Sequence, residues 1–141
     1  MTTSTTRLMI AAAALVVAAG SASAQSYKAQ IPMAFSASGA VMEPGSYEIR
    51  AVHAASPTYY VQNLETKRSV LVVAGSKADP PKAWKDSGAP RIGFACWEDG
   101  CALTSLWDGQ AFAADRFSYK QSTTLAYRHT QMVTVAMIRT R

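Results

Sequence analysis

RIGFACWEDGCALTSLWD, residues 91–108, is the stretch that decides the fold of this chain. Two runs in which apolar and polar side chains alternate flank a short tip, Trp97-Glu98-Asp99-Gly100. Alternation on both sides of a turn is typical of a β-hairpin with one buried face. We therefore expect an antiparallel pair of strands here, to which the other strands of the domain add.

The register of this hairpin depends on the length of its turn. A two-residue turn at Asp99-Gly100, or a three-residue loop, would offset the two cysteines. A two-residue turn at Glu98-Asp99, or a four-residue loop with Gly100 in the left-handed conformation, places Cys96 opposite Cys101. Directly opposed side chains have Cβ atoms about 4.5–5.5 Å apart, close to disulfide distance, so we expect a Cys96–Cys101 disulfide. The same register pairs further residues: Phe94 with Leu103, and Ile92 with Ser105.

Residues 1–24 are expected to be a secretory signal peptide, and residues 25–141 a single all-β domain. Arg7 precedes an apolar run, Leu8–Ala19, and Ala22-Ser23-Ala24 offers a small-x-small cleavage site. The apolar run is shorter than the roughly 20 residues that span a membrane, and no later segment approaches that length. We expect a periplasmic or secreted protein, in a compartment that favours pairing of its two cysteines.

Alternation continues through most of the remaining chain. Tyr47 and Ile49 should face a core while Glu48 and Arg50 face solvent, after a turn at Glu43-Pro44-Gly45. Together with the hairpin, the expected strands number about seven or eight, and no strong helix is expected. This pattern predicts a small antiparallel β-barrel or β-sandwich. The expected strands outside the hairpin are Tyr27–Ser36, Ser46–His53, Thr58–Leu64, Ser69–Ala74, Ser122–Tyr127 and Met132–Ile138.

Three segments carry more specific expectations. Ser69–Ala74 is a continuous apolar run, which favours a deeply buried strand. Gly75–Pro90 is rich in proline, glycine and charge, which favours a long loop. Gln110–Asp115 is expected to form a helical turn.

Composition and charge exclude several classes of protein. A chain with 49% hydrophobic and 16% charged residues is neither a collagen, a coiled coil nor a disordered tail. The net charge of +5 is scattered along the chain, and its basic residues do not gather on one element. Nucleic acid is therefore not an expected partner.

The sequence contains no motif that indicates catalysis. Phosphate-binding loops, nucleophile elbows and zinc-protease motifs are absent. His53 and His129 are the two candidate bases, and both are expected at exposed or turn positions. Glu98 and Asp99 are adjacent, so on a strand their side chains would face opposite ways. We expect no enzyme, no metal and no cofactor.

The aromatic residues divide into two groups. Tyr47, Phe94 and Trp107 lie on faces expected to point into the core. Trp84 in the proline-rich segment and Trp97 at the hairpin tip have no evident core face. These two tryptophans are the candidates for ligand or surface contact, because exposed indole rings bind flat apolar ligands and sugars.

Two parts of the chain resemble a family of small secreted bacterial β-proteins, common in Acidobacteria and other soil bacteria. Ile31-Pro32-Met33-Ala34-Phe35 and Glu43-Pro44-Gly45-Ser46-Tyr47 are similar to that family's "(I/V)-P-F-x-F … L-P-A-G-x-Y" opening. The later Ile92-Gly93-Phe94, Cys101-Ala102-Leu103 and Leu106-Trp107 are similar to its "L-x-F-x … Y-F-L … v-W" hairpin. The resemblance implies a secreted β-fold and transfers no catalytic residue.

We expect a non-catalytic binding module or an envelope-associated structural module, whose partner is an envelope component or a small ligand. A carrier of small apolar ligands is an alternative, and it requires a barrel cavity of a few hundred Å³. A hydrolase or isomerase with its site in the barrel mouth is a second alternative, and it requires a buried cluster such as a histidine beside a carboxylate. The module, whether binding or structural, instead predicts a filled interior and an exposed patch around Trp84 or Trp97.

Overall fold

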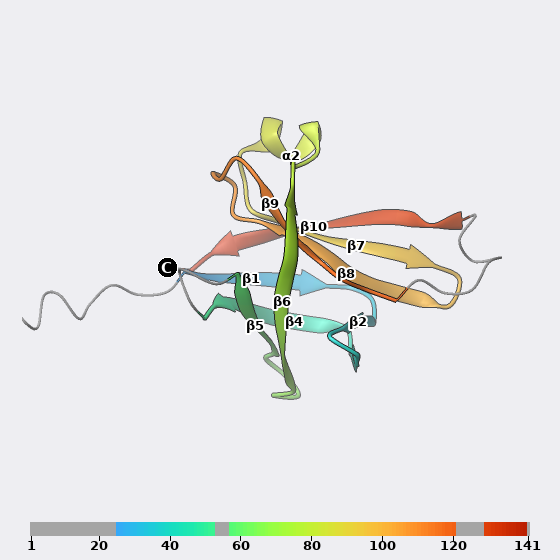
Figure 1. Ribbon diagram of the computed structural model, residues 1–141. Coiled ribbons are helices and arrows are strands. Elements are labelled where there is room, and N and C mark those ends of the chain that lie inside the picture. The colour runs from blue at the N-terminus through green and yellow to red at the C-terminus, as the bar shows by residue number, and fades with distance from the viewer. Residues whose placement is uncertain (1–24, 53–56, 121–128, 141) are drawn as a thin grey trace, which may run out of the picture.

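The computed structural model describes residues 25–52, 57–120 and 129–140, and these form a closed β-barrel (Figure 1). The predicted signal peptide, the expected strand Ser122–Tyr127 and His53 lie outside the described residues. The elements are β1 Ser26–Ile31, β2 Phe35–Ala37, β3 Ala40–Met42, β4 Gly45–Ala51, β5 Thr58–Asn63, β6 Ser69–Ala78, α2 Lys82–Ser87, β7 Arg91–Trp97, β8 Gly100–Trp107, β9 Ala114–Phe117 and β10 Gln131–Arg139.

Eight antiparallel strands close the barrel in the order β8-β7-β10-β1-β4-β5-β6-β9. The last strand, β9, pairs back onto β8 through two residue pairs, Ser105 with Arg116 and Leu106 with Asp115. The remaining two strands, β2 and β3, form a hairpin beside the ring, attached to β8 by a parallel bridge at Ser36 and Ala102. The prediction of an all-β fold is confirmed, and its architecture is the barrel.

The core lies inside this ring. Tyr47 and Ile49 are fully buried on β4 while Arg50 is exposed, which confirms the predicted alternation. The β2–β3 hairpin contributes Phe35, whose ring lies edge-on to Tyr47 and Phe94 with centroid distances of 5.3 and 5.2 Å. This hairpin therefore fills part of the barrel interior.

The β7–β8 hairpin has the register that pairs its cysteines. Its turn is at Glu98-Asp99, and Cys96 lies opposite Cys101. Phe94 lies opposite Leu103, as predicted. The predicted pairing of Ile92 with Ser105 is wrong.

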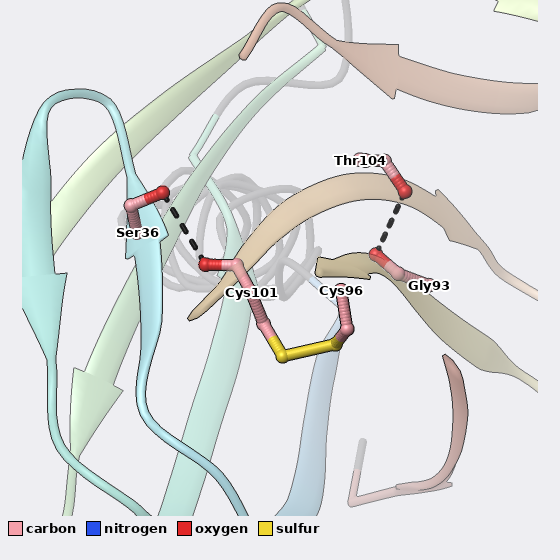
Figure 2. The surroundings of a disulfide bond; sticks show 5 residues. All are labelled: Ser36, Gly93, Cys96, Cys101 and Thr104. Carbon is pink, nitrogen blue, oxygen red and sulfur yellow. Dashed lines mark hydrogen bonds between the residues drawn. A yellow bond between two sulfur atoms is a disulfide. The ribbon is translucent and has the colours of Figure 1, made fainter. Parts of the chain in front are cut away.

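A β-bulge between Gly93 and Phe94 accounts for this error, since it shifts the register so that Ile92 lies opposite Leu106. Thr104 is the additional residue on β8, and its hydroxyl donates a 3.1 Å hydrogen bond to the Gly93 carbonyl (Figure 2). The side chain of the extra residue thus binds back across the hairpin at the bulge.

The strand β6 is longer and far more exposed than predicted. It extends to Ala78, and Val72 is its one buried residue. Leu71 and Val73 are 52% and 62% exposed. A barrel is a single closed sheet, and only its inner face is buried. Every second residue of this apolar run therefore faces outward.

The segment predicted to be a loop, Gly75–Pro90, contains the end of β6 and the short helix α2 (Figure 1). The helix places Trp84 in a second apolar cluster with Trp107 and Ala114. Gly88 ends the helix in the left-handed conformation, with φ 63°.

Two further expectations are corrected. Gln110–Asp115 forms bends that lead into β9, because Asp108 accepts hydrogen bonds from the N–H groups of Gln110 and Ala111. The expected strand Tyr27–Ser36 is divided into β1 and β2 by a break that begins at Pro32. In the three described ranges, no helix is long and apolar enough to cross a membrane.

Candidate functional site

The barrel wall has an opening where β9 leaves β6. The upper half of β6, Ala74–Ala78, pairs with β9. The lower half, Ser69–Val73, pairs with β5 on one side, and no described residue pairs with its other side. In Figure 1, β6 crosses in front of β7 and β8, and its pairing with β9 ends at Ala74.

A cavity of about 630 Å³ occupies this opening, and we call it the lateral cleft. Its floor is apolar, because Val72, Leu103 and Phe117 are buried members of the barrel core. Its rim is polar and includes serine hydroxyls and the ammonium group of Lys120. The lining residues are Ser36, Ala37, Ser38, Gly39, Val72, Val73, Leu103, Phe117, Ser118, Tyr119 and Lys120.

The disulfide supports one wall of the lateral cleft. Cys96 and Cys101 are bonded, with an S–S distance of 2.10 Å and a Cα–Cα distance of 4.0 Å. The Ser36 hydroxyl donates a long, 3.4 Å hydrogen bond to the Cys101 carbonyl (Figure 2). The crosslink therefore fixes the part of β8 to which the β2–β3 hairpin, and with it four lining residues, is attached.

Trp97 lies beside the lateral cleft. It is partly buried at the end of β7, and its ring stacks on Tyr119 at a centroid distance of 6.2 Å and an interplanar angle of 21°. Tyr119 lines the cleft. Trp97 therefore acts on the cleft through Tyr119, by holding that ring in place.

Trp84, the second candidate for contact, is far from being a surface residue. It is 7% exposed, and its indole N–H donates a 3.2 Å hydrogen bond to the Thr134 hydroxyl. Its ring packs over Gly93, where an added Cβ would lie 3.1 Å from the indole. The expectation that Trp84 lacks a core face is therefore wrong. Its core is formed where the helix α2 packs on Gly93 of β7, and this contact is not visible in the local sequence.

The barrel interior also contains a polar pair that sequence reasoning missed. Asp115 on β9 is 9% exposed. The Tyr59 hydroxyl donates a short hydrogen bond to its carboxylate, and Lys77 Nζ lies 3.9 Å from its other oxygen. Burial, together with the hydrogen bond to Asp115, raises the pKa of Tyr59 far above its usual value of 10.0.

This pair offers little acid–base chemistry near neutral pH, because the phenol keeps its proton. The alternating pattern Ala114–Phe117 was the one signal that could have placed Asp115 inside, since it puts Asp115 and Phe117 on the same face. His129 is exposed. In the part of the chain that the structure describes, no three His, Cys, Asp or Glu residues are placed to hold a metal ion.

Comparison with known proteins found no match for this chain, whether among protein-family models, curated proteins or solved structures.

Proposed function

We propose that this chain is a non-catalytic binding domain that takes an apolar group of its ligand into the lateral cleft. The observation that carries the proposal is the volume of about 630 Å³ that opens onto the barrel core. Ligand sites in proteins have cavities of about 300–1,000 Å³ with mostly apolar walls and a few polar groups. The cleft fits that description, since its floor is apolar and its rim carries hydroxyls and one ammonium group.

This proposal joins the binding module to the alternative of an apolar-ligand carrier. The module, binding or structural, was expected to have a filled interior and an exposed patch at Trp84 or Trp97, whereas the lateral cleft opens onto the core, Trp84 is buried and Trp97 is stacked on Tyr119. The hydrolase or isomerase alternative has weaker support. The buried carboxylate of Asp115 is paired with a phenol whose pKa is raised.

We further propose that the domain acts in the periplasm or outside the cell. The apolar leader with its small-x-small site supports export. The Cys96–Cys101 disulfide is compatible with an oxidising compartment.

The test is binding of the apolar fluorophore N-phenylnaphthylamine, followed by its fluorescence on titration with the protein. We expect saturable binding to the wild type. Val73→Trp should abolish it, because Val73 lines the lateral cleft and an indole there would fill the opening.

Val41→Trp is the matched control. Val41 is a similarly exposed strand valine, on β3, that does not line the cleft. The proposal is wrong if the wild type does not bind the fluorophore, or if both tryptophan variants bind it as the wild type does.

A further inference from the structure

We propose that the loop between β8 and β9 is a membrane-contact site, at which the ring of Phe112 enters the surface of an anionic lipid bilayer. The loop comprises residues 108–113, and we call it the Phe112 loop. Phe112 is 99% exposed, whereas the other three phenylalanines of the chain are buried. This site is separate from the lateral cleft, none of whose lining residues belongs to the loop.

The Phe112 loop is held in place although its apex is exposed. The Asp108 carboxylate accepts hydrogen bonds from the N–H groups of Gln110 and Ala111, at 2.8 and 2.7 Å. The Trp107 indole N–H donates a 2.8 Å hydrogen bond to the Ala111 carbonyl. Trp107 is itself buried in the second apolar cluster, so the residue before Phe112 is tied to the barrel wall.

The base of the loop is fixed as well. Arg139 donates a 2.9 Å hydrogen bond to the Asp108 carbonyl. Gly109 lies against the end of α2, since an added Cβ there would be 3.0 Å from the Pro90 backbone nitrogen. Because the loop is ordered in advance, binding through Phe112 would cost little conformational entropy. A fully exposed ring on such a loop forgoes the burial that normally stabilises a fold, and this geometry points to a contact outside the chain.

The surroundings of the Phe112 loop are described by the structure. The loop and the segments that touch it lie within the ranges 57–120 and 129–140. Figure 1 shows the loop beside α2, at the end of β6 that extends beyond the other strands. The exposure of Phe112 is therefore that of a ring whose neighbouring elements are all in place.

The end of the molecule that carries Phe112 is positively charged. Asp79 and Asp86 are exposed here, but Asp79 is paired with Lys85 at 2.7 Å. Asp108 is half-buried and Asp115 is buried. Cations outnumber these carboxylates, and an anionic lipid surface attracts such an end. The exposed cations on β6, α2, β9 and β10 are Lys77, Lys82, Lys85, Arg116 and Arg139.

The small apolar area of the loop favours lipid over a protein partner or a second copy of this chain. Phe112 is the one large exposed apolar residue in the ranges 77–91 and 107–116, which are described throughout. A stable protein interface buries about 1,200–2,000 Å² around an apolar core of several side chains. A bilayer needs no matching shape and combines a few apolar side chains with nearby cations. Gln110, Ala111 and Ala113 beside the ring carry no charge, so the apex can enter the lipid surface without burying one.

The experiment measures co-sedimentation of residues 25–141 with lipid vesicles. These residues include every described element, and they exclude the expected leader, whose apolar run would itself bind lipid. Vesicles of phosphatidylglycerol and phosphatidylethanolamine in equal parts should bind the domain, and added salt should weaken the binding because it screens the cations. Vesicles of phosphatidylcholine alone should bind at least about tenfold more weakly, since they carry no net charge.

Substitutions at exposed positions test the role of the ring. Phe112→Ser should weaken binding to the anionic vesicles at least about tenfold, because no ring is then buried in lipid. Phe112→Trp should retain binding, since tryptophan is favoured at membrane interfaces. Val41→Ser is the matched control and should bind as the wild type does. Val41 is 65% exposed on β3, in the hairpin that Figure 1 places away from α2.

Fluorine NMR gives a second readout at the ring itself. In a domain labelled with fluorinated phenylalanine, Phe112 is the one exposed ring among four, and its signal is identified by its loss in Phe112→Ser. A spin-labelled lipid in the anionic vesicles should broaden this signal more than the signals of the three buried rings. Equal broadening of all four signals would contradict the proposed contact.

Three further results would overturn the inference. The first is a wild-type domain that does not sediment with the anionic vesicles. The second is a folded Phe112→Ser variant that binds them as tightly as the wild type, or a Val41→Ser variant that binds them as weakly as Phe112→Ser. The third is a dimer in sedimentation velocity that Phe112→Ser abolishes while vesicles do not bind, since the occupant is then a second copy. The proposed function is tested separately, because Phe112→Ser should bind N-phenylnaphthylamine as the wild type does.

Discussion

Removal of the disulfide by the double substitution Cys96→Ser and Cys101→Ser should destabilise the barrel by a modest, calculable amount. The bond closes a loop between residues five apart in the sequence. In the chain-entropy treatment, a loop this short contributes about 2 kcal/mol to the free energy of unfolding. For a domain of this size, that corresponds to a fall in Tm of roughly 6–12 °C.

The assay is thermal unfolding followed by circular dichroism, with and without reductant. Reductant should lower the Tm of the wild type to that of the double variant and leave the variant unchanged. The spectrum below the transition should stay that of a β-protein, because the strand ladders do not depend on the bond. A wild-type melt that reductant does not change would refute the reasoning.

Other substitutions test the second cluster, the buried pair and a tight turn. Trp84→Ala should lower the free energy of unfolding by about 3–5 kcal/mol in a urea titration, and Gly93→Ala should also destabilise, since its Cβ would collide with Ser105 Oγ and lie 3.1 Å from the indole. Stability should fall as pH rises above about 10, because the raised pKa of Tyr59 means that the folded state holds a proton that the unfolded state has released; Tyr59→Phe should make this alkaline slope in urea midpoints shallower. Gly109→Ala should lower the Tm, because Gly109 has φ +89° and an added Cβ would lie 3.0 Å from the Pro90 backbone nitrogen.

The sequence predicted those features that depend on local pattern. Period-two alternation identified strands such as β4, β7 and β8, whereas β3 and β9 were not predicted. The cysteine spacing selected the correct register around Glu98-Asp99. The same reasoning failed at Ile92, because a bulge shifts the register between Gly93 and Phe94, where the Thr104 hydroxyl hydrogen-bonds across the hairpin. In an alternating run, such a threonine is indistinguishable from one that faces solvent.

The candidate site could not be predicted because it arises from contacts distant in the sequence. The lateral cleft exists because β9 pairs with Ala74–Ala78 and then separates from β6, and no local pattern indicates where a strand ends its pairing. The burial of Trp84 likewise depends on Gly93, which lies on another element. Trp97 was identified as a contact candidate, and the structure places it next to the cleft through Tyr119.

The narrow junction between β8 and β9 has a dynamic consequence. Two residue pairs hold this seam, Ser105 with Arg116 and Leu106 with Asp115, while the neighbouring β7–β8 ladder extends over the whole hairpin. Local fluctuations concentrate where the fewest contacts hold a structure together. Amide hydrogens at the β8–β9 seam should exchange with solvent before those of the β7–β8 hairpin. Transient opening of the seam would let ligands larger than the lateral cleft enter while the rest of the barrel stays folded.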